Sequence, residues 1–343
     1  MDGRDILALS ADVVEALLEG REQETLASIA EAYKAHGRGD SSLPHSLFLR
    51  FPADERSRII ALPAYLGDGF GVAGMKWVSS FPANLEKGLN RASAVIILNS
   101  ARTGQTEVIM EGSLVSAKRT AASAALAAQH LVSRGETPES VGVVGCGPIN
   151  FEVVRFLLAV WPALRRVRVF DVDGARAEQF RSKCERLGGG LEVEVAPELK
   201  TVLRASPVTS LATTAATPHI PDLADCAPGS VVLHVSLRDL APEAILACDN
   251  VVDDIDHVCR AQTSIHLAEQ LTGGREFIRC TLADILDGRA PEKKDADAVT
   301  VFSPFGLGVL DLAVAQLVSG LASERGYGTR LENFLPAPYT GQR

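Results

Sequence analysis

The sequence predicts an α/β protein in which a doubly wound parallel sheet is joined to a second, α+β domain. Three observations lead to this prediction. The chain has 343 residues, which is too long for one small core. Apolar strands and helical segments alternate through its second half, as they do where helices cover both faces of a parallel sheet. Its first third instead favours consecutive strands, which is typical of an antiparallel sheet.

The N-terminal third predicts two short helices and then a run of strands. Apolar residues recur at helical spacing from Ser10 to His36, and the break near Gly20 separates two helices. The expected strands are Ser46–Phe51, Ile59–Leu62, Gly71–Ser80, Ala92–Asn99 and, after a turn at Ser100–Gln105, Thr106–Met110.

The remainder predicts alternating strands and helices. Ser116 is expected to cap an Ala-rich helix that ends near Val132, with Gly135 just beyond it. The expected strands are Val141–Val144, Val167–Asp171, Leu191–Val195, Val208–Ala212, Val231–Val235 and Asn250–Val252, with helices from about Asn150 and from Gly174. A last apolar helix, Gly308–Leu321, is expected to pack on the first region. The first domain is therefore placed at residues 1–115 with 316–343, and the second at 116–315.

Composition excludes several classes of function. A formal net charge of −9 disfavours a surface for nucleic acid, whose affinity comes from clustered Lys and Arg. The 6 cysteines form no C-x-x-C pair and no cluster with zinc spacing, so no metal is expected. No secretory signal is recognised, and no apolar run approaches the roughly 20 residues of a membrane span. We therefore expect a cytoplasmic protein with reduced thiols and no membrane partner.

A glycine turn follows the apolar strand at Val141–Val144. Gly145 allows a tight turn, and Gly147 lets the backbone approach a pyrophosphate at a helix N-terminus. Asn150 replaces the third glycine of the usual fingerprint, which weakens the pattern without removing phosphate binding. The turn predicts a Rossmann-type domain that binds a dinucleotide through Gly145, Gly147, Pro148, Ile149 and Asn150.

An acid, Asp171, ends the next expected strand, 24 residues after Gly147. Asp171 is placed to accept hydrogen bonds from the adenosine ribose hydroxyls and would repel a 2′-phosphate. The sequence therefore predicts NAD as the cofactor, although Arg176 nearby leaves NADP open. The alternative interpretation is a glycine turn without a ligand, followed by a solvated aspartate.

Several motifs, taken in order, carry a family resemblance. They are MKWVSSFP (75–82), GLNRASAVIILN (88–99), MEGS (110–113), RTAA (119–122), GCGPINFE (145–152), HVSLRDL (234–240) and SPFGLGVLDLA (303–313). From about residue 45 to about residue 325 the chain resembles the ornithine cyclodeaminase/mu-crystallin family. Within that family it is most similar to the N-(2-amino-2-carboxyethyl)-L-glutamate dehydrogenases of siderophore and peptide-antibiotic pathways.

The resemblance implies a homodimer whose first domains pair through their sheets, with an active site between the domains. It implies hydride transfer from a substrate Cα–H to bound nicotinamide. In the subgroup, a secondary amine at the glutamate carbon becomes an imine. Hydrolysis of that imine releases 2-oxoglutarate and L-2,3-diaminopropionate, so the expected partner is a small amino-dicarboxylate.

Three residues match the family's functional positions. Lys76 matches its active-site lysine; desolvation of such a lysine would lower its pKa and suit it as a base or carboxylate anchor. Arg119 matches its carboxylate-binding arginine and is expected in the first turn of its helix, where the backbone dipole favours an anion. Asp239 follows the strand VVLHVS and matches its catalytic aspartate. A surface lysine, a solvated arginine and a helix-capping aspartate are the competing interpretations.

Other candidates follow from the chemistry of the implied substrate. Because it carries three carboxylates, Arg91 and Arg50 are further candidates for substrate binding, set against surface salt bridges. Thr213 and Thr214 follow an apolar strand and are expected near the nicotinamide, unless they serve only the turn. Ser303 is expected near the carboxamide.

The sequence leaves some alternatives open. Asp225 or Asp253, rather than Asp239, can be the aspartate that enters the site. A long glycine-rich loop with a Pro-Gly-Lys run, present in cyclodeaminases, is absent at SLRDL (236–240). Ornithine cyclodeaminase, alanine dehydrogenase and ketimine reductase activities remain alternatives, as does a non-catalytic, crystallin-like dinucleotide-binding protein.

Overall fold

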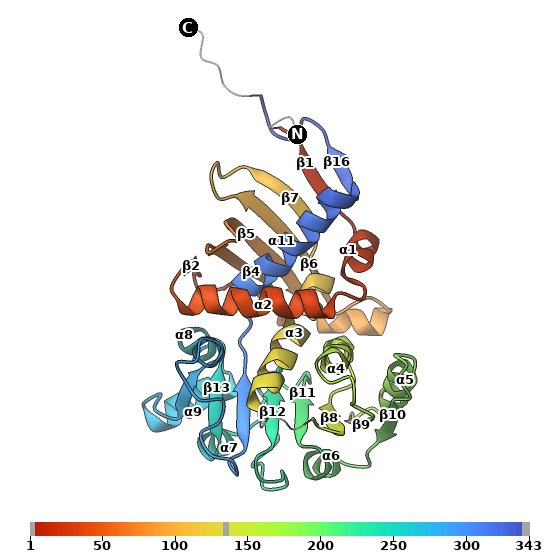
Figure 1. The fold of residues 1–343 in the computed structure, drawn as a ribbon, viewed down its shortest axis with the longest axis vertical. Helices are drawn as coiled ribbons and strands as arrows, with labels where there is room; N and C mark the ends of the chain where they lie inside the picture. Colours follow the sequence, from red (N-terminus) through yellow and green to blue (C-terminus); the bar gives the residue numbers. More distant parts are fainter. Residues whose placement is uncertain (1–3, 133–136, 338–343) are drawn as a thin grey trace. The chain divides into compact units, whose positions relative to one another are not determined.

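The computed structural model describes residues 4–132 and 137–337. The chain forms two compact units (Figure 1). Unit 1 comprises Met1–Arg21, Arg38–Ser116 and Leu307–Arg343, and unit 2 comprises Glu22–Gly37 and Ala117–Gly306. Unit 1 is α+β and unit 2 is a Rossmann-type parallel α/β unit, so the predicted fold class is confirmed.

The two units differ from the expected domains, 1–115 with 316–343 and 116–315, in two places. Helix α2 (Glu22–Gly37) groups with unit 2, because it packs on α10 (Leu282–Leu286) and α4 (Pro148–Val160). Helix α11 (Gly308–Arg325) lies wholly in unit 1, because it packs on the sheet there. Helical periodicity shows that a helix has a face to bury, but not which sheet will bury it.

Unit 1 is built on an 8-stranded sheet with strand order β16-β1-β7-β6-β5-β4-β2, and β3 also pairs with β4. Its strands are β1 (Ile6–Leu9), β2 (Ser41–Ser42), β3 (Leu47–Phe51), β4 (Asp54–Leu66), β5 (Val72–Ser80), β6 (Ala92–Ser100), β7 (Thr106–Glu111) and β16 (Thr329–Leu331). The expected antiparallel arrangement holds from β2 to β7. It is wrong at β1, which pairs parallel with β7.

The two faces of this sheet differ. Lys76 lies opposite Leu62 and Ile96, and these three buried side chains share the face on which α11 packs. Leu47 and Trp77 both lie opposite Ala61, on the other face, where they are 69% and 37% exposed. One face is therefore part of the core, while the other presents apolar side chains. Helix α1 (Ala11–Leu18) packs on α11, and η1 (Pro82–Lys87) connects β5 to β6.

Unit 2 contains the second 8-stranded sheet, with order β10-β9-β8-β11-β12-β15-β13-β14. Its strands are β8 (Ser140–Val144), β9 (Arg166–Phe170), β10 (Glu192–Val195), β11 (Val208–Leu211), β12 (Val231–His234), β13 (Asp249–Val252), β14 (Ile278–Thr281) and β15 (Thr300–Ser303). All the strand pairs described in this sheet are parallel. The chain moves outward from β8 to β10 and then returns to β11, so the switch point lies between β8 and β11. Ligands of such sheets bind at the carboxyl ends of the strands beside this point.

The remaining helices are α3 (Ser113–Leu131), α5 (Gly174–Glu185), α6 (Leu199–Ala205), α7 (Pro242–Leu246), α8 (Ile255–Val258) and α9 (Ser264–Thr272). In the part of the chain that the structure describes, no helix is long and apolar enough to cross a membrane.

Two predicted helix starts are wrong. Helix α3 begins at Ser113 rather than at Ser116, because the Glu111 carboxylate accepts hydrogen bonds from the backbone N–H groups of Ser113 (2.7 Å) and Leu114 (3.0 Å). A side-chain acceptor there replaces the expected serine cap. Helix α4 begins at Pro148 rather than at Asn150, because the fixed φ of proline suits the first helical position. Gly135 lies outside the described residues.

Candidate active site

The glycine turn between β8 and α4 has the geometry that a dinucleotide requires. Gly145 has φ +90°, and a Cβ there would lie 2.5 Å from the Ala212 carbonyl oxygen. A Cβ on Gly147 would meet no atom of the described residues within 4 Å. The chain therefore turns tightly at Gly145 and presents open backbone at Gly147, the N-cap of α4. A pyrophosphate fits this cradle at the positive end of a helix.

Asn150, in the place of the third glycine, supports this turn. Its fully buried side chain donates hydrogen bonds to the carbonyl oxygens of Val144 (2.9 Å) and Gly145 (2.7 Å). It also accepts one from the Ser210 hydroxyl (2.6 Å) on β11. The amide therefore ties the turn to the neighbouring strand, and its role toward a cofactor is to position the loop.

Asp171 comes directly after β9, because the strand ends at Phe170, one residue before the predicted end. One carboxylate oxygen accepts from the Cys146 backbone N–H (2.8 Å) in the glycine turn, and the other from the Asp173 N–H (2.9 Å). The carboxylate thus lies beside the turn, as the acid that receives a ribose does. Arg176 lies 3.7 Å from Asp173, with which it forms an ion pair.

A cavity of about 250 Å³ lies in unit 2 at the carboxyl ends of β11, β12 and β15. Its lining includes Arg119, Ile149, Thr213, Ser236 and Gly306. Ile149 follows the glycine turn, while Thr213, Ser236 and Gly306 follow β11, β12 and β15 in that order. Arg119 comes from α3. The cavity therefore occupies the place beside the switch point where a nicotinamide and a substrate are expected.

Arg119 is buried, with 8% of its surface exposed. It lies in the second turn of α3, not in the first, because the helix begins at Ser113. A Cβ on Gly306, where φ is +92°, would lie 2.9 Å from an Arg119 Nη atom, so glycine leaves room for the guanidinium. The charge of Arg119, rather than the helix dipole, is what offers an anion a partner here.

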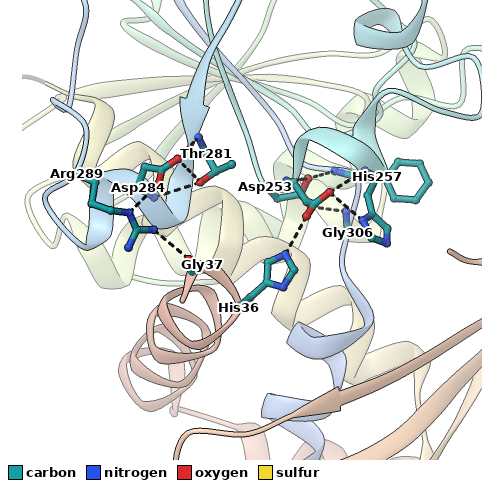
Figure 2. Close-up of polar contacts among 10 residues, drawn as sticks. His36, Gly37, Asp253, His257, Thr281, Asp284, Arg289 and Gly306 are labelled. Atoms are coloured by element: carbon teal, nitrogen blue, oxygen red, sulfur yellow. Dashed lines mark hydrogen bonds and ion pairs between the residues drawn. The ribbon is translucent and has the colours of Figure 1, made fainter. Parts of the chain in front are cut away.

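Asp253 fixes the loop beside Arg119. Its buried carboxylate accepts hydrogen bonds from the backbone N–H groups of Phe305 (2.9 Å) and Gly306 (2.7 Å), as Figure 2 shows for Gly306. Burial raises the pKa of Asp253 despite these hydrogen bonds. Burial also raises the pKa of Tyr33, whose hydroxyl lies 2.7 Å from Ser123 Oγ, and the Asp253 carboxylate adds to that rise. Because Phe305 and Gly306 line the cavity, the Asp253 carboxylate that holds their backbone shapes the cavity wall.

Asp254 anchors the end of α2 to unit 2. His36 Nε2 lies 3.0 Å from one of its carboxylate oxygens, and His257 Nδ1 lies 2.9 Å from the other. Figure 2 shows His36 reaching from α2 toward the loop of Asp253 and His257, while Arg289 donates to the Gly37 carbonyl. Although burial opposes ionisation, the hydrogen bonds from His257 and His36 lower the pKa of Asp254.

From the His257–Asp254 pair we predict that the free energy of unfolding depends on pH. Burial opposes protonation of His257, but the hydrogen bond and charge of Asp254 outweigh it and raise the pKa of His257; Asp253 adds to the rise and Arg260 opposes it. A raised histidine pKa contributes stability below the ordinary value of about 6.5, and this contribution is lost as pH rises through the raised pKa. We expect the free energy of unfolding to fall over that window, and His257→Gln to remove this part of the dependence.

Urea unfolding of both proteins between pH 5 and pH 9 is the measurement, with His266→Gln on α9 as the matched control. A wild type and a His257→Gln variant with parallel pH profiles would contradict the expectation.

Asp239 lies beneath the cavity. It is fully buried, and it accepts hydrogen bonds from the hydroxyls of Thr213 and Ser236, both of which line the cavity. His234 Nε2 accepts from the Asp239 backbone N–H (3.2 Å). Burial opposes ionisation, but His234 and the two hydroxyls lower the pKa of Asp239. The Asp239 carboxylate is therefore separated from the cavity by two hydroxyl groups, those of Thr213 and Ser236, to which it is hydrogen-bonded.

The other candidates of unit 2 have separate places. The Ser303 hydroxyl, fully buried, lies 3.2 Å from His234 Nδ1 and so faces that ring. Thr214 is exposed, unlike Thr213. Asp225 accepts a hydrogen bond from Arg204. Of the three aspartates left open by the sequence, Asp239 contacts cavity-lining hydroxyls, whereas Asp253 holds the cavity wall.

Lys76 lies in β5 of unit 1 and is 3% exposed. Its ammonium is 3.0 Å from Ser116 Oγ and 2.7 Å from Oδ2 of Asp311, a fully buried residue of α11. Lys76 is therefore buried, as expected of an active-site lysine, but it lies in an ion pair rather than in an apolar pocket. Asp311 is not among the residues predicted from the sequence, although an acid in the apolar run GVLDLAVA (308–315) was a signal.

Arg50 and Arg91 lie at the same end of the unit 1 sheet. Arg50 is exposed, lies over the Phe48 ring, and pairs in register with Arg58, which in turn pairs with Ser80. Arg91 donates to the Ser80 hydroxyl (3.3 Å), and burial lowers the pKa of its half-buried guanidinium. Both arginines are therefore near this sheet end.

Among residues 4–132 and 137–337, no group of three or more His, Cys, Asp or Glu side chains is placed to hold a metal ion.

Comparison with known proteins places this geometry in context. The model of the ornithine cyclodeaminase/mu-crystallin family matches residues 6–326. The chain is 27% identical, over 96% of its length and 98% of the relative's, to N-((2S)-2-amino-2-carboxyethyl)-L-glutamate dehydrogenase of Staphylococcus aureus. The crystal structure of CmnK is similar with a TM-score of 0.87 and 30% identity, covering 96% of this chain and 98% of that one. An archaeal alanine dehydrogenase dimer with bound NAD gives a TM-score of 0.84 and 26% identity, covering 96% and 99%.

Proposed function

Because the chain belongs to the ornithine cyclodeaminase/mu-crystallin family, we propose that it oxidises N-(2-amino-2-carboxyethyl)-L-glutamate with NAD. Hydrolysis of the resulting imine would release 2-oxoglutarate and L-2,3-diaminopropionate. The chain is an enzyme of the NAD-dependent type that acts on C–N bonds of amino acids. The choice of this substrate, and a supply of diaminopropionate for siderophores or peptide antibiotics, belong to the proposal.

One observation carries the proposal. Arg119 is buried in the wall of a cavity that adjoins the glycine turn and the switch point of the sheet. A guanidinium in a cavity wall can bind a carboxylate with two hydrogen bonds, and a substrate carboxylate held there would lie beside the expected nicotinamide position. NAD, when bound, supplies the hydride acceptor. Gly145, Gly147, Pro148 and Ile149 would hold its pyrophosphate, and Asp171 its ribose.

The other candidate residues complete the proposal. Lys76 and Asp239 are the proposed acid–base groups, and Arg119, Arg91 and Arg50 the proposed partners of the substrate carboxylates. Thr213 lines the cavity and is the proposed neighbour of the nicotinamide. Thr214 and Ser303, which do not line the cavity, are proposed as further neighbours of the nicotinamide half of the cofactor. Asp239 would act through the cavity-lining hydroxyls that it binds.

The test is to incubate the pure protein with N-(2-amino-2-carboxyethyl)-L-glutamate and NAD, following absorbance and identifying products by mass. We expect NADH, 2-oxoglutarate and diaminopropionate in equal amounts. Alanine dehydrogenase is the second candidate, because that enzyme of Archaeoglobus fulgidus is also 27% identical over 96% of this chain. If alanine and NAD gave NADH, pyruvate and ammonia, and the proposed substrate gave no NADH, alanine dehydrogenase would become the first candidate.

We also propose a homodimer formed through the open face of the unit 1 sheet. On this face Leu47 and Leu49 are 69% and 46% exposed, and Tyr65 and Trp77 are each 37% exposed. Apolar side chains gathered on one sheet face favour association with a like surface.

The double variant Leu47→Glu/Leu49→Glu should weaken the dimer. Burying a leucine contributes about 1.5–3 kcal/mol, so the dissociation constant should rise at least roughly tenfold. Sedimentation velocity should show monomers of 36.4 kDa at concentrations where the wild type is dimeric. Leu271→Glu, on α9 and 58% exposed, is the matched control and should stay dimeric. If the Leu47→Glu/Leu49→Glu variant stayed dimeric, this face would be ruled out as the dimer interface.

A further inference from the structure

We propose that Asp239 passes a proton between the cavity and solvent, with Thr213 as its contact on the cavity side and His219 as its outlet. The inference rests on the proposed amine oxidation, which must release a proton. His219 was not among the candidates of the sequence, because an isolated histidine after a turn has no pattern that distinguishes it. Its place in the structure gives it this role.

One carboxylate oxygen of Asp239 connects the cavity to the surface. Thr213, which lines the cavity, donates its hydroxyl to Oδ1 and accepts from the Ala215 backbone N–H (3.1 Å). His219 Nε2 lies 3.9 Å from the same Oδ1, and its side chain is 42% exposed. Oδ1 therefore stands between a cavity hydroxyl and a ring that reaches water.

The other oxygen of Asp239 contacts the cavity-lining Ser236 and a buried histidine, and neither leads to the outer surface. Oδ2 accepts from the Ser236 hydroxyl and lies 3.4 Å from His234 Nε2. His234 is fully buried, and its Nδ1 faces the Ser303 hydroxyl (3.2 Å), which is also fully buried. Ser236 faces the cavity rather than solvent, and the other two groups of this arm, His234 and Ser303, are fully buried. We therefore assign this arm to holding the carboxylate in place. Exchange with solvent belongs to the Oδ1 arm.

The backbone holds His219 beside Asp239. The N–H groups of His219 and Ile220 both donate to the Asp239 carbonyl oxygen at 2.9 Å, and Ile220 forms a parallel bridge with Leu240. The main chain of the outlet is thus fixed to that of the aspartate. A small rotation of the half-exposed ring, or one bridging water, closes the 3.9 Å gap.

The proton balance of the step is simple. Oxidation of the secondary amine removes a hydride from its carbon and a proton from its nitrogen, as the C=N bond forms. Thr213 Oγ takes that proton while it gives its own to Asp239 Oδ1. His219 Nε2 then takes the proton from Oδ1, and Nδ1 releases one to water, as the two nitrogens of an imidazole allow. One proton reaches solvent for each hydride removed.

The experiment compares His219→Asn with the matched control His266→Asn, using whichever amine the wild type oxidises with NAD. We expect His219→Asn to lower kcat by about 100-fold or more, to enlarge the solvent deuterium isotope effect, and to regain activity with imidazole buffer. NAD affinity, measured by calorimetry, should not change. A kcat equal to that of the wild type, or a loss that imidazole does not restore, would overturn the outlet role.

Two further variants test the cavity side. Thr213→Val keeps the side-chain shape without the hydroxyl and should lose activity comparably, whereas Thr213→Ser should retain most of it. Equal activity of the Val and Ser variants would overturn the role of Thr213. A wild type that oxidises another amine but not N-(2-amino-2-carboxyethyl)-L-glutamate counts against the proposed function alone, since the proton route is measured on that other amine.

Discussion

Lys76→Met should destabilise the protein by about 3–5 kcal/mol, since it removes the counter-charge from a buried carboxylate. The lost ammonium lies 2.7 Å from Asp311 Oδ2, and both side chains are buried. The same change should lower kcat by roughly 10²–10⁴-fold if Lys76 transfers a proton. Urea unfolding measures the first effect, and steady-state oxidation of the amine with NAD measures the second.

The double variant Lys76→Met/Asp311→Leu separates these two effects. Replacing both members of a buried ion pair with apolar residues of similar volume is often neutral or stabilising. We therefore expect the double variant to regain most of the free energy of unfolding while kcat stays low. Recovery of both quantities together would show that Lys76 is a structural residue and would remove it from the chemistry.

Arg119→Met should lower kcat/KM by roughly 30-fold to several thousand-fold. Removing one member of a buried, hydrogen-bonded charge pair costs about 2–5 kcal/mol, and a substrate carboxylate is the proposed partner of Arg119. Arg119→Lys should restore part of the loss, because it keeps the charge without the planar fork. Kinetics with varied substrate, and with guanidinium ion added to the Met variant, are the measurements.

NAD affinity provides the control for Arg119. The glycine turn and Asp171 come from other segments than α3, so calorimetry should give the same dissociation constant for NAD in wild type and Arg119→Met. Arg186→Met, just after α5, serves as the matched variant and should leave kcat/KM unchanged. An Arg119→Met enzyme with normal kcat/KM would remove the carboxylate anchor from the proposal.

The buried ion pair bears on how Lys76 can act. The Lys76 ammonium lies 2.7 Å from Asp311 Oδ2, so the carboxylate fixes where the ammonium lies. Asp311 is thus a positioning residue for Lys76. Asp239 is held by Ser236 and His234 from its own segment of the chain and by Thr213, which lies 26 residues earlier in the chain.

The sequence by itself determined the class of the fold and the cofactor turn. Alternation of apolar strands and helices follows from local periodicity, and it predicted the parallel sheet of unit 2. Gly145 was readable because only glycine adopts its backbone conformation without strain, and Asp171 because its spacing from that turn is fixed by one strand–helix unit. These features depend on residues close together in the chain.

Only the tertiary structure decided which distant groups meet. The strands β1, β2 and β16 have 4, 2 and 3 residues, too few for a periodic pattern, and they are defined by their pairing with neighbouring strands of the sheet. Helix α2 joined unit 2, and Asp311 came to Lys76, because packing matches faces across the whole chain. The Thr213 hydroxyl meets Asp239 because β11 and β12 are neighbours in the sheet, and His219 lies there because its N–H donates to the Asp239 carbonyl oxygen. Periodicity in the sequence indicates whether one face of a helix or strand is apolar or polar. Which other element packs against that face depends on residues far away in the chain.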